Sequence, residues 1–244
     1  IIYLNRTAML MAYLHLLKIE PKSALEQLLQ TFNISKKELQ QDYQKIVDTI
    51  DALVDENSGA CPICDLGLSV DMPFSSKLSA PYRMDLAITY RCNLNCAHCY
   101  NARERSYPEL PTSEWKKILY KLWQTGIPHV VFTGGEPTLR DDLPELVCHA
   151  DQLGMVTGIN TNGSRLGDRS LLESLIQAGL DHVQITLESH DPAIHEAMVQ
   201  RQGAWEKTIA GIKNVVDSKL YMMTNTTLLS NNASELEKTL DFLA

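Results

Sequence analysis

The chain has 244 residues, of which 44% are hydrophobic and 21% charged, and its formal net charge is -8. This length and composition predict a sizeable core divided between one large and one small domain. The acidic balance argues against a nucleic-acid partner, because phosphate neutralisation needs Lys and Arg. No segment reaches the ~20 apolar residues that cross a bilayer, so we expect no membrane partner.

Residues 1–56 predict a small, mostly helical domain. Ile1 to Leu4 is typical of the end of a strand, and three helices are expected near residues 7–18, 23–32 and 35–55. Because Ile1 is not an initiator methionine, we expect further strands before it. The third helix carries an apolar stripe about one-third of its circumference wide. The stripe comprises Leu39, Tyr43, Ile46, Val47, Ile50, Leu53 and Val54.

This order of one strand end and three helices, opening with Leu-Asn-Arg-Thr, is similar to a known winged-helix domain. That domain is the peptide-binding fold of the peptide chaperone in pyrroloquinoline quinone biosynthesis. The resemblance implies that residues 1–56 recognise a leader peptide, which adds a strand to a sheet edge beside the third helix. A helical cap that only packs on the next domain is the alternative. The net charge disfavours a DNA-binding winged helix.

A linker is expected at residues 57–83, where Asn57-Ser58-Gly59, Pro73 and Pro81 indicate irregular backbone. The linker carries Cys61-Pro-Ile-Cys64, and such a pair supplies at most half of a tetrahedral site. Three interpretations stay open: part of a zinc or auxiliary iron–sulfur site, a redox or disulfide pair, and two plain thiols.

Residues 84–244 predict five consecutive βα units and therefore an α/β fold. Strands are expected near 84–89, 129–133, 155–161, 182–188 and 221–228, and amphipathic helices near 112–125, 141–153, 168–178, 205–218 and 234–244. Right-handed crossovers would wrap these units into an open barrel with all carboxyl strand ends at one edge. Because the sequence stops within a helix at Ala244, we expect that a further strand is missing.

Three cysteines lie in one short loop after the first strand, Cys92-Asn-Leu-Asn-Cys96-Ala-His-Cys99. They can hold three corners of a [4Fe-4S] cube and leave the fourth iron open for a substrate or cofactor. Ordinary cluster carriers use a fourth cysteine, and zinc sites favour paired Cys-x2-Cys units. A zinc knuckle is the alternative. Cys148, on a helix between the second and third strands, is predicted to be a buried small hydrophobe.

Polar residues recur where the later strands end. Gly134-Gly135-Glu136-Pro137 follows the second strand, Asn160 and Asn162 lie at the end of the third, and Thr186 and Glu188 at the end of the fourth. Glycines let a backbone approach a ligand closely, and a carboxylate accepts hydrogen bonds from an ammonium group. Since parallel strands end at one edge, we expect these residues to share a site with the cysteines.

The cysteine spacing resembles that of the radical S-adenosylmethionine (SAM) superfamily, whose signature is Cys-x3-Cys-x-aromatic-Cys, with His98 in the aromatic position. The resemblance implies a partial (β/α)6-type barrel. It also implies an open iron that chelates SAM, followed by reductive cleavage to a 5'-deoxyadenosyl radical. The SAM contacts that it implies are His98, Gly134, Gly135, Glu136, Pro137, Asn160, Asn162, Thr186 and Glu188.

Two features of this list, and one further candidate, need comment. The resemblance implies that the Glu136 carboxylate receives the SAM amino group. Thr186-Leu187-Glu188 departs from the commoner Ser-Leu-Asp and lengthens the acidic side chain. Arg201 is a further candidate, as a partner for the SAM carboxylate.

We therefore expect a radical SAM peptide maturase whose small domain captures a precursor's leader while the barrel abstracts hydrogen from the core peptide. Epimerisation, crosslinking and backbone excision all begin with this step, so the product stays open. The alternatives are a sulfatase or quinohaemoprotein maturase and a non-catalytic peptide-docking iron–sulfur protein. An electron donor such as ferredoxin or flavodoxin is expected, and a reducing, cytoplasmic compartment, because the cluster and free thiolates need one.

Overall fold

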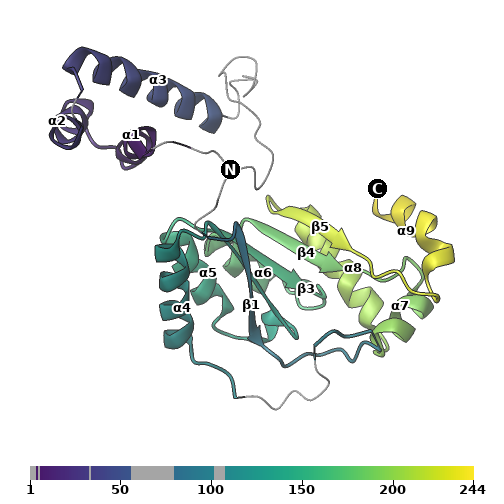
Figure 1. Ribbon diagram of the computed structural model, residues 1–244. Coiled ribbons are helices and arrows are strands. Elements are labelled where there is room, and N and C mark those ends of the chain that lie inside the picture. The colour runs from purple at the N-terminus through teal and green to yellow at the C-terminus, as the bar shows by residue number, and fades with distance from the viewer. Residues whose placement is uncertain (1–3, 5, 33, 56–79, 102–107) are drawn as a thin grey trace. The chain divides into compact units, whose positions relative to one another are not determined.

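The computed structural model describes residues 4, 6–32, 34–55, 80–101 and 108–244 (Figure 1). The chain divides into two compact units, Ile1–Lys77 and Leu78–Ala244. Cys61 and Cys64 lie outside the described residues, as do residues 1–3 of the predicted first strand.

The first unit contains helices α1 (Arg6–Leu16), α2 (Pro21–Thr31) and α3 (Lys36–Val54). α3 begins at a capping box, in which the Ser35 hydroxyl accepts from the Glu38 backbone N–H at 3.3 Å and donates to the Glu38 carboxylate at 2.6 Å. Within the described part of this unit there are three helices and no strand. The winged-helix interpretation therefore stays a prediction.

The three helices bury a small core of their own. Its fully enclosed members are Met11, Ala24, Leu28, Leu39 and Tyr43. Leu39 and Tyr43 begin the predicted apolar stripe of α3, whereas Val54 at its end is 68% exposed. The stripe thus holds the helices together in its first half and leaves apolar surface uncovered near its last turn.

The second unit contains a parallel sheet of five strands in the order β1-β2-β3-β4-β5. The strands are β1 (Arg83–Thr89), β2 (His129–Gly134), β3 (Val156–Thr161), β4 (His182–Thr186) and β5 (Tyr221–Asn225). Each strand pairs with the next along the sequence, as consecutive βα units require. The α/β prediction is confirmed.

The connecting helices form one continuous layer, in which α4 contacts α5, α5 contacts α6, and α6 contacts α8 (Figure 1). They are α4 (Thr112–Thr125), α5 (Leu143–Gln152), α6 (Arg169–Gln177) and α8 (Ala204–Val216), and α9 (Leu236–Leu243) follows β5. Two short 3-10 helices, η1 (Pro137–Leu139) and η2 (Ala233–Glu235), lie in the same unit. The core between sheet and helices includes Phe132, Leu146, Ile159, Leu175 and Val215.

The last two strands end at Thr186 and Asn225, earlier than predicted. Beyond them the Thr227 N–H donates to the Glu188 carboxylate at 2.9 Å. Because this backbone donor is taken by a side chain, the ladder between the two strands stops.

One helix, α7 (Pro192–Val199), was not among the predicted amphipathic helices. A start signal is nevertheless present, because the Asp191 side chain accepts from the Ala193 N–H at 2.7 Å and Pro192 occupies the first turn. The helix is short and mostly apolar, so its periodicity is weak.

None of the described helices is long and apolar enough to cross a bilayer.

Candidate active site

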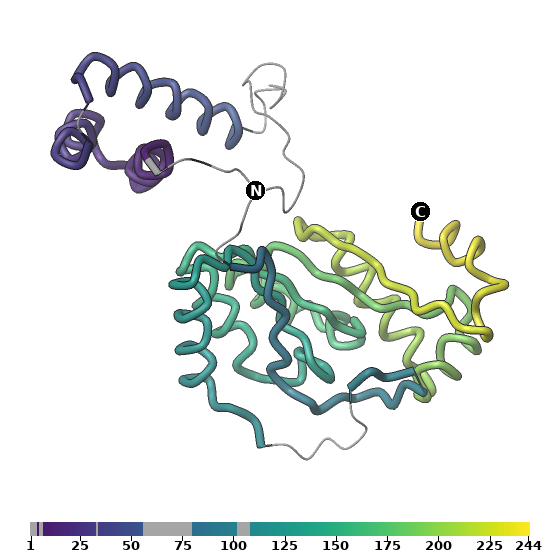
Figure 2. Tube along the Cα trace, in the orientation of Figure 1, coloured from purple at the N-terminus to yellow at the C-terminus, as the bar shows by residue number. Residues whose placement is uncertain are grey.

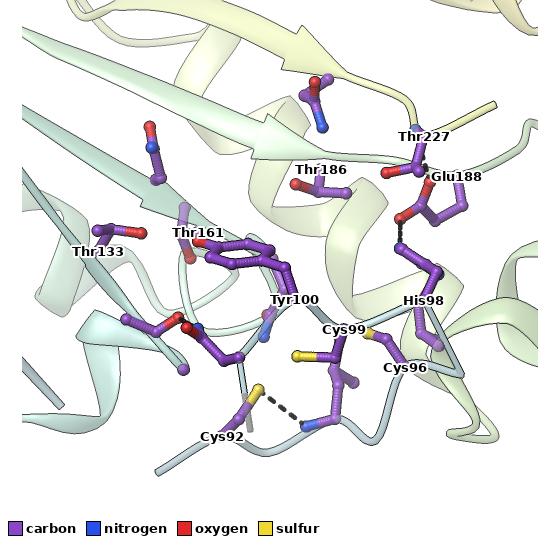
Figure 3. A pocket seen from close by; sticks show the side chains of 18 residues that line it. Cys92, Cys96, His98, Cys99, Tyr100, Thr133, Thr161, Thr186, Glu188 and Thr227 are labelled. Carbon is purple, nitrogen blue, oxygen red and sulfur yellow. Dashed lines mark hydrogen bonds and ion pairs between the residues drawn. The ribbon is translucent and has the colours of Figure 1, made fainter. Parts of the chain in front are cut away.

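The three cysteines of the loop after β1 line one pocket together with the carboxyl ends of the other four strands (Figure 3). The pocket holds about 820 Å³ of empty space, part of it open to solvent. Its walls are formed by Cys92, Leu94, Cys96, His98, Cys99, Tyr100, Asn101, Thr133, Gly134, Gly135, Asn160, Thr161, Asn162, Thr186, Glu188, Val199, Asn225 and Thr227. The juxtaposition expected from the strand ends is therefore present.

The cysteine-bearing loop is held from one side by α7. The backbone N–H groups of Asn95 and Ala97 donate to the carbonyls of Val199 and Met198 at 3.1 and 3.0 Å. Leu94 is buried against Val199 beside these bonds. Figure 2 shows the two segments, far apart in sequence, running side by side. The last turn of α7, whose carbonyls need donors, thus fixes the middle of the loop.

The two glycines at the carboxyl end of β2, Gly134 and Gly135, hold the loop from the other side. A Cβ on Gly134 would lie 2.0 Å from the Thr89 carbonyl oxygen, and one on Gly135 would lie 2.2 Å from the Arg91 carbonyl oxygen. The Gly135 N–H donates to the Thr89 carbonyl at 2.8 Å. We expected the glycines to admit a ligand, and both do line the pocket. The structure adds that they admit the backbone that leads into the cysteine loop.

Glu136 follows β2, and its carboxylate is enclosed by protein hydrogen-bond donors. Its side chain is 0% exposed and does not line the pocket. One oxygen accepts from the Thr138 N–H at 3.1 Å, the Thr138 hydroxyl at 2.6 Å and the Thr161 hydroxyl at 2.7 Å, and the other accepts from the Asn162 N–H at 2.8 Å. Burial raises the pKa of this carboxyl, and the four donors oppose the rise. Both oxygens thus join the ends of β2 and β3, and the expected contact of Glu136 with the SAM amino group stays a prediction.

Asn162 lines the pocket, but its side chain is engaged by the protein. Its amide donates to Asn93 Oδ1 at 2.8 Å, and its oxygen accepts from the Ser164 N–H at 3.0 Å and the Ser164 hydroxyl at 2.6 Å. Asn93 in turn donates to the Ser164 hydroxyl at 2.7 Å. Since Asn93 follows Cys92 directly, Asn162 ties the start of the cysteine loop to β3.

Glu188 and His98 contact one another at the opposite wall. The Glu188 carboxylate lies 2.9 Å from His98 Nε2, and it is 1% exposed (Figure 3). Burial raises the pKa of Glu188, which the nearby His98 and the Thr227 N–H oppose. The Glu188 N–H donates to His195 Nδ1 at 3.2 Å. Burial lowers the pKa of His195 to about 4, so this imidazole is neutral and accepts.

The donor set fits a cationic iron cluster with a polar cofactor beside it. Burial, together with the Cys92 and Cys99 thiols and Glu188, raises the pKa of the Cys96 thiol to about 11. Three such thiolates beside a carboxylate need positive charge to compensate them, which iron ions supply. In the described ranges no three His, Cys, Asp or Glu side chains surround a single metal position. A cluster instead takes each thiolate on a different iron.

Two pocket-lining residues each have a buried polar atom that makes no hydrogen bond within the described part of the chain. Asn160 Oδ1 and His98 Nδ1 have no hydrogen-bond partner among the described residues. Buried polar atoms are normally satisfied, so these two are places for ligand donors. Thr186, from the same predicted set, also lines the pocket.

Two predicted contacts lie elsewhere. Arg201 is exposed and does not line the pocket, since α7 ends two residues earlier, at Val199, and Gln200 caps it in the left-handed conformation. Pro137 is buried at the start of η1, outside the pocket wall. Both assignments to SAM stay predictions.

Sequence reasoning missed several residues of the wall. Thr133, Thr161 and Asn225 line the pocket, and they are among the last residues of β2, β3 and β5. Each is polar in an apolar strand near its carboxyl end, so the strand-end rule already applied to Asn160 would have found them. Asn101 had no such signal, and only its hydrogen bond to the Gly134 carbonyl reveals its place.

Comparison with known sequences identifies a family for the second unit. The sequence model of the Radical SAM superfamily matches residues 86–243. The PqqA peptide cyclase of Bradyrhizobium diazoefficiens is 37% identical over 158 residues, which are 64% of this chain and 41% of the cyclase. The chain thus spans less than half the length of that relative.

Two solved structures share the fold. Streptococcus suis SuiB bound to S-adenosylmethionine matches with a TM-score of 0.62 and 20% identity over 99% of this chain and 54% of SuiB. The structure called anSMEcpe with bound AdoMet matches with a TM-score of 0.55 and 18% identity over 66% of this chain and 48% of its own. The likeness to SuiB therefore includes the first unit, and identities this low show the fold alone.

Proposed function

The chain belongs to the radical SAM superfamily, and from that premise we propose that it binds a [4Fe-4S] cluster through Cys92, Cys96 and Cys99, with SAM beside it. The observation that carries the proposal is the gathering of these three thiols and the strand ends in one pocket. Cluster and SAM together would supply one-electron cleavage to a 5'-deoxyadenosyl radical.

The chain's own residues would bind and orient SAM from the strand ends. Asn160 Oδ1 is the acceptor available for a ribose hydroxyl, and Thr186 lies on the next strand. Gly134 and Gly135 offer backbone rather than side chains. Leu94 and Val199 form an apolar part of the wall, which would help to exclude water from the reacting atoms.

The test of this site is anaerobic reconstitution with iron and sulfide. We expect about four irons per chain and a broad absorption near 400 nm, both lost in the Cys92→Ala, Cys96→Ala, Cys99→Ala variant. Cys148→Ala is the matched control, because Cys148 lies on α5 and outside the pocket wall, and it should keep both. Retention of a full cluster by the triple variant would overturn the ligand assignment.

We propose that the hydrogen is abstracted from a ribosomally made precursor peptide. Support comes from the PqqA peptide cyclase, by its name a peptide-modifying relative, and from SuiB, also solved bound to its precursor peptide SuiA. Epimerisation, crosslinking and backbone excision share the first step, so the proposal ends at abstraction. A ferredoxin or flavodoxin would supply the electron, and the cytoplasm is the proposed location.

We further propose that residues 1–56 recognise the leader of that peptide. The helices have a core of their own, and the likeness to SuiB covers them. α3 also leaves Val54 exposed and Leu53 half-buried, as an apolar anchor for a peptide. A sulfatase-type maturase would not need this unit, so peptide binding by it separates the two candidates.

The leader proposal is tested by titrating the full chain with a candidate precursor peptide encoded beside its gene. We expect micromolar binding, about -8 kcal/mol, that Val54→Asp weakens at least tenfold. Lys37→Glu, on the opposite polar face of α3, should leave it unchanged. If the Val54→Asp variant bound the precursor peptide as tightly as the unsubstituted chain, the leader proposal would be wrong, and the unit would be a helical packing cap.

A further inference from the structure

Two positions at which this sequence departs from the common radical SAM pattern contact each other. His98 occupies the aromatic position of the cysteine motif, and Glu188 replaces the commoner Asp. Their side chains meet at 2.9 Å, between Nε2 and a carboxylate oxygen. An aspartate side chain is shorter by one C–C bond, roughly 1.5 Å, and from the same backbone position it would not reach the imidazole.

The Glu188 carboxylate cannot turn away from this contact, because its surroundings fix it. The second carboxylate oxygen accepts from the Thr227 N–H at 2.9 Å. The backbone carbonyl of Glu188 accepts from the Asn232 side-chain amide at 2.8 Å. Its N–H donates to His195. The residue is 1% exposed. The end of β4 therefore presents a rigid acceptor to the cysteine loop.

A rigid acceptor fixes the orientation of the His98 imidazole. With Nε2 held 2.9 Å from the carboxylate, Nδ1 lies on the other side of the ring. That atom is buried and has no hydrogen-bond partner among the described residues, and the ring lines the pocket. The pair thus holds the ring, and with it Nδ1, in one orientation beside Cys99, where the cofactor would lie.

We propose that His98 and Glu188 are positioning residues that act as one unit, so that Glu188 sets the orientation in which His98 meets SAM in this pocket. The inference rests on the proposed function, since it presupposes that SAM occupies this pocket. It goes beyond that function by assigning one role to two departures from the family pattern.

The test is a double-mutant cycle on SAM affinity, measured by isothermal titration of the reconstituted full chain. His98→Tyr and Glu188→Asp should each weaken SAM binding about tenfold, because each changes the length of one side of the contact. The double variant should recover to within about threefold of the unsubstituted protein, since the longer phenol compensates for the shorter carboxylate. His98→Phe with Glu188→Asp should show no recovery, because the phenyl ring has no donor.

The outcomes separate the possible failures. If the double variant loses affinity by the product of the single effects, about 100-fold, the two residues act independently and the inference is wrong. An unchanged affinity in either single variant, or a lost cluster, would overturn it as well. Glu145→Asp, in an exposed pair with Lys116, is the matched control and should bind SAM normally. If the unsubstituted protein binds no SAM, the proposed function itself has failed.

Discussion

Replacing Glu136 by Gln distinguishes a structural carboxylate from a ligand for SAM. The carboxylate accepts from two backbone donors, the N–H groups of Thr138 and Asn162, one on each oxygen. An amide has only one oxygen, so in either orientation its NH2 group faces one of these donors. Leaving a buried donor unsatisfied lowers the free energy of unfolding by about 1–3 kcal/mol. Removing the desolvation cost of a buried charge offsets part of this loss. We expect a net loss of about 2 kcal/mol.

This loss is measurable by urea unfolding followed by tryptophan fluorescence. Trp115, Trp123 and Trp205 all lie in the second unit, so the signal reports that unit alone. With an m-value of about 2 kcal/mol per molar urea, the midpoint should fall by about 1 M. Glu145→Gln, which alters an exposed ion pair, should shift it by less than about half of that.

The same variant should bind SAM within about threefold of normal once the cluster is reconstituted. If Glu136 instead received the SAM amino group, the loss of a charge-assisted hydrogen bond would weaken SAM affinity about ten- to hundredfold. An unchanged unfolding midpoint together with a tenfold or larger loss of affinity would refute the structural assignment.

Two further predictions follow from burial and close packing. The folded-state pKa of His195 is lowered to about 4 from 6.5, so the unfolded chain binds more protons, and stability should fall by about 3 kcal/mol as the pH drops from 6.5 to 4. The unfolding free energy should be measured against pH for the His195→Gln variant and for the unsubstituted chain. The variant should lack the fall in stability between pH 6.5 and 4 that His195 causes. An identical pH dependence of the two proteins would contradict the assignment. Gly135→Ala should destabilise the second unit by about 2 kcal/mol or more, because its Cβ would lie 2.2 Å from the Arg91 carbonyl, and its urea midpoint reports the loss. Gly167→Ala, with ordinary contacts only, is the matched control, and equal midpoints for the two variants would be inconsistent with the close approach.

The sequence by itself determined the order of the βα units, the parallel sheet and the family. Hydrophobic periodicity and local start and stop signals are properties of short segments, which is why five strands and their helices could be predicted. The cysteine spacing also lies within eight residues, and strand ends must meet at one edge of a parallel sheet. These local facts were enough to bring Cys92, Asn160, Thr186 and Glu188 into one expected site.

Tertiary structure alone decided what each side chain of that site does. Glu136 and Glu188 both follow apolar strands, yet one is enclosed by four donors and the other lines the pocket. Two sets of contacts join segments about 90 or more residues apart. One is the contact of His98 with Glu188, and the other is the pair of hydrogen bonds between the cysteine loop and the end of α7. Such contacts depend on how helices and loops pack, because burial and hydrogen-bond saturation are set by neighbours in space. A strand-end position therefore indicates a place near the site, and only packing decides whether the side chain faces the ligand or the core.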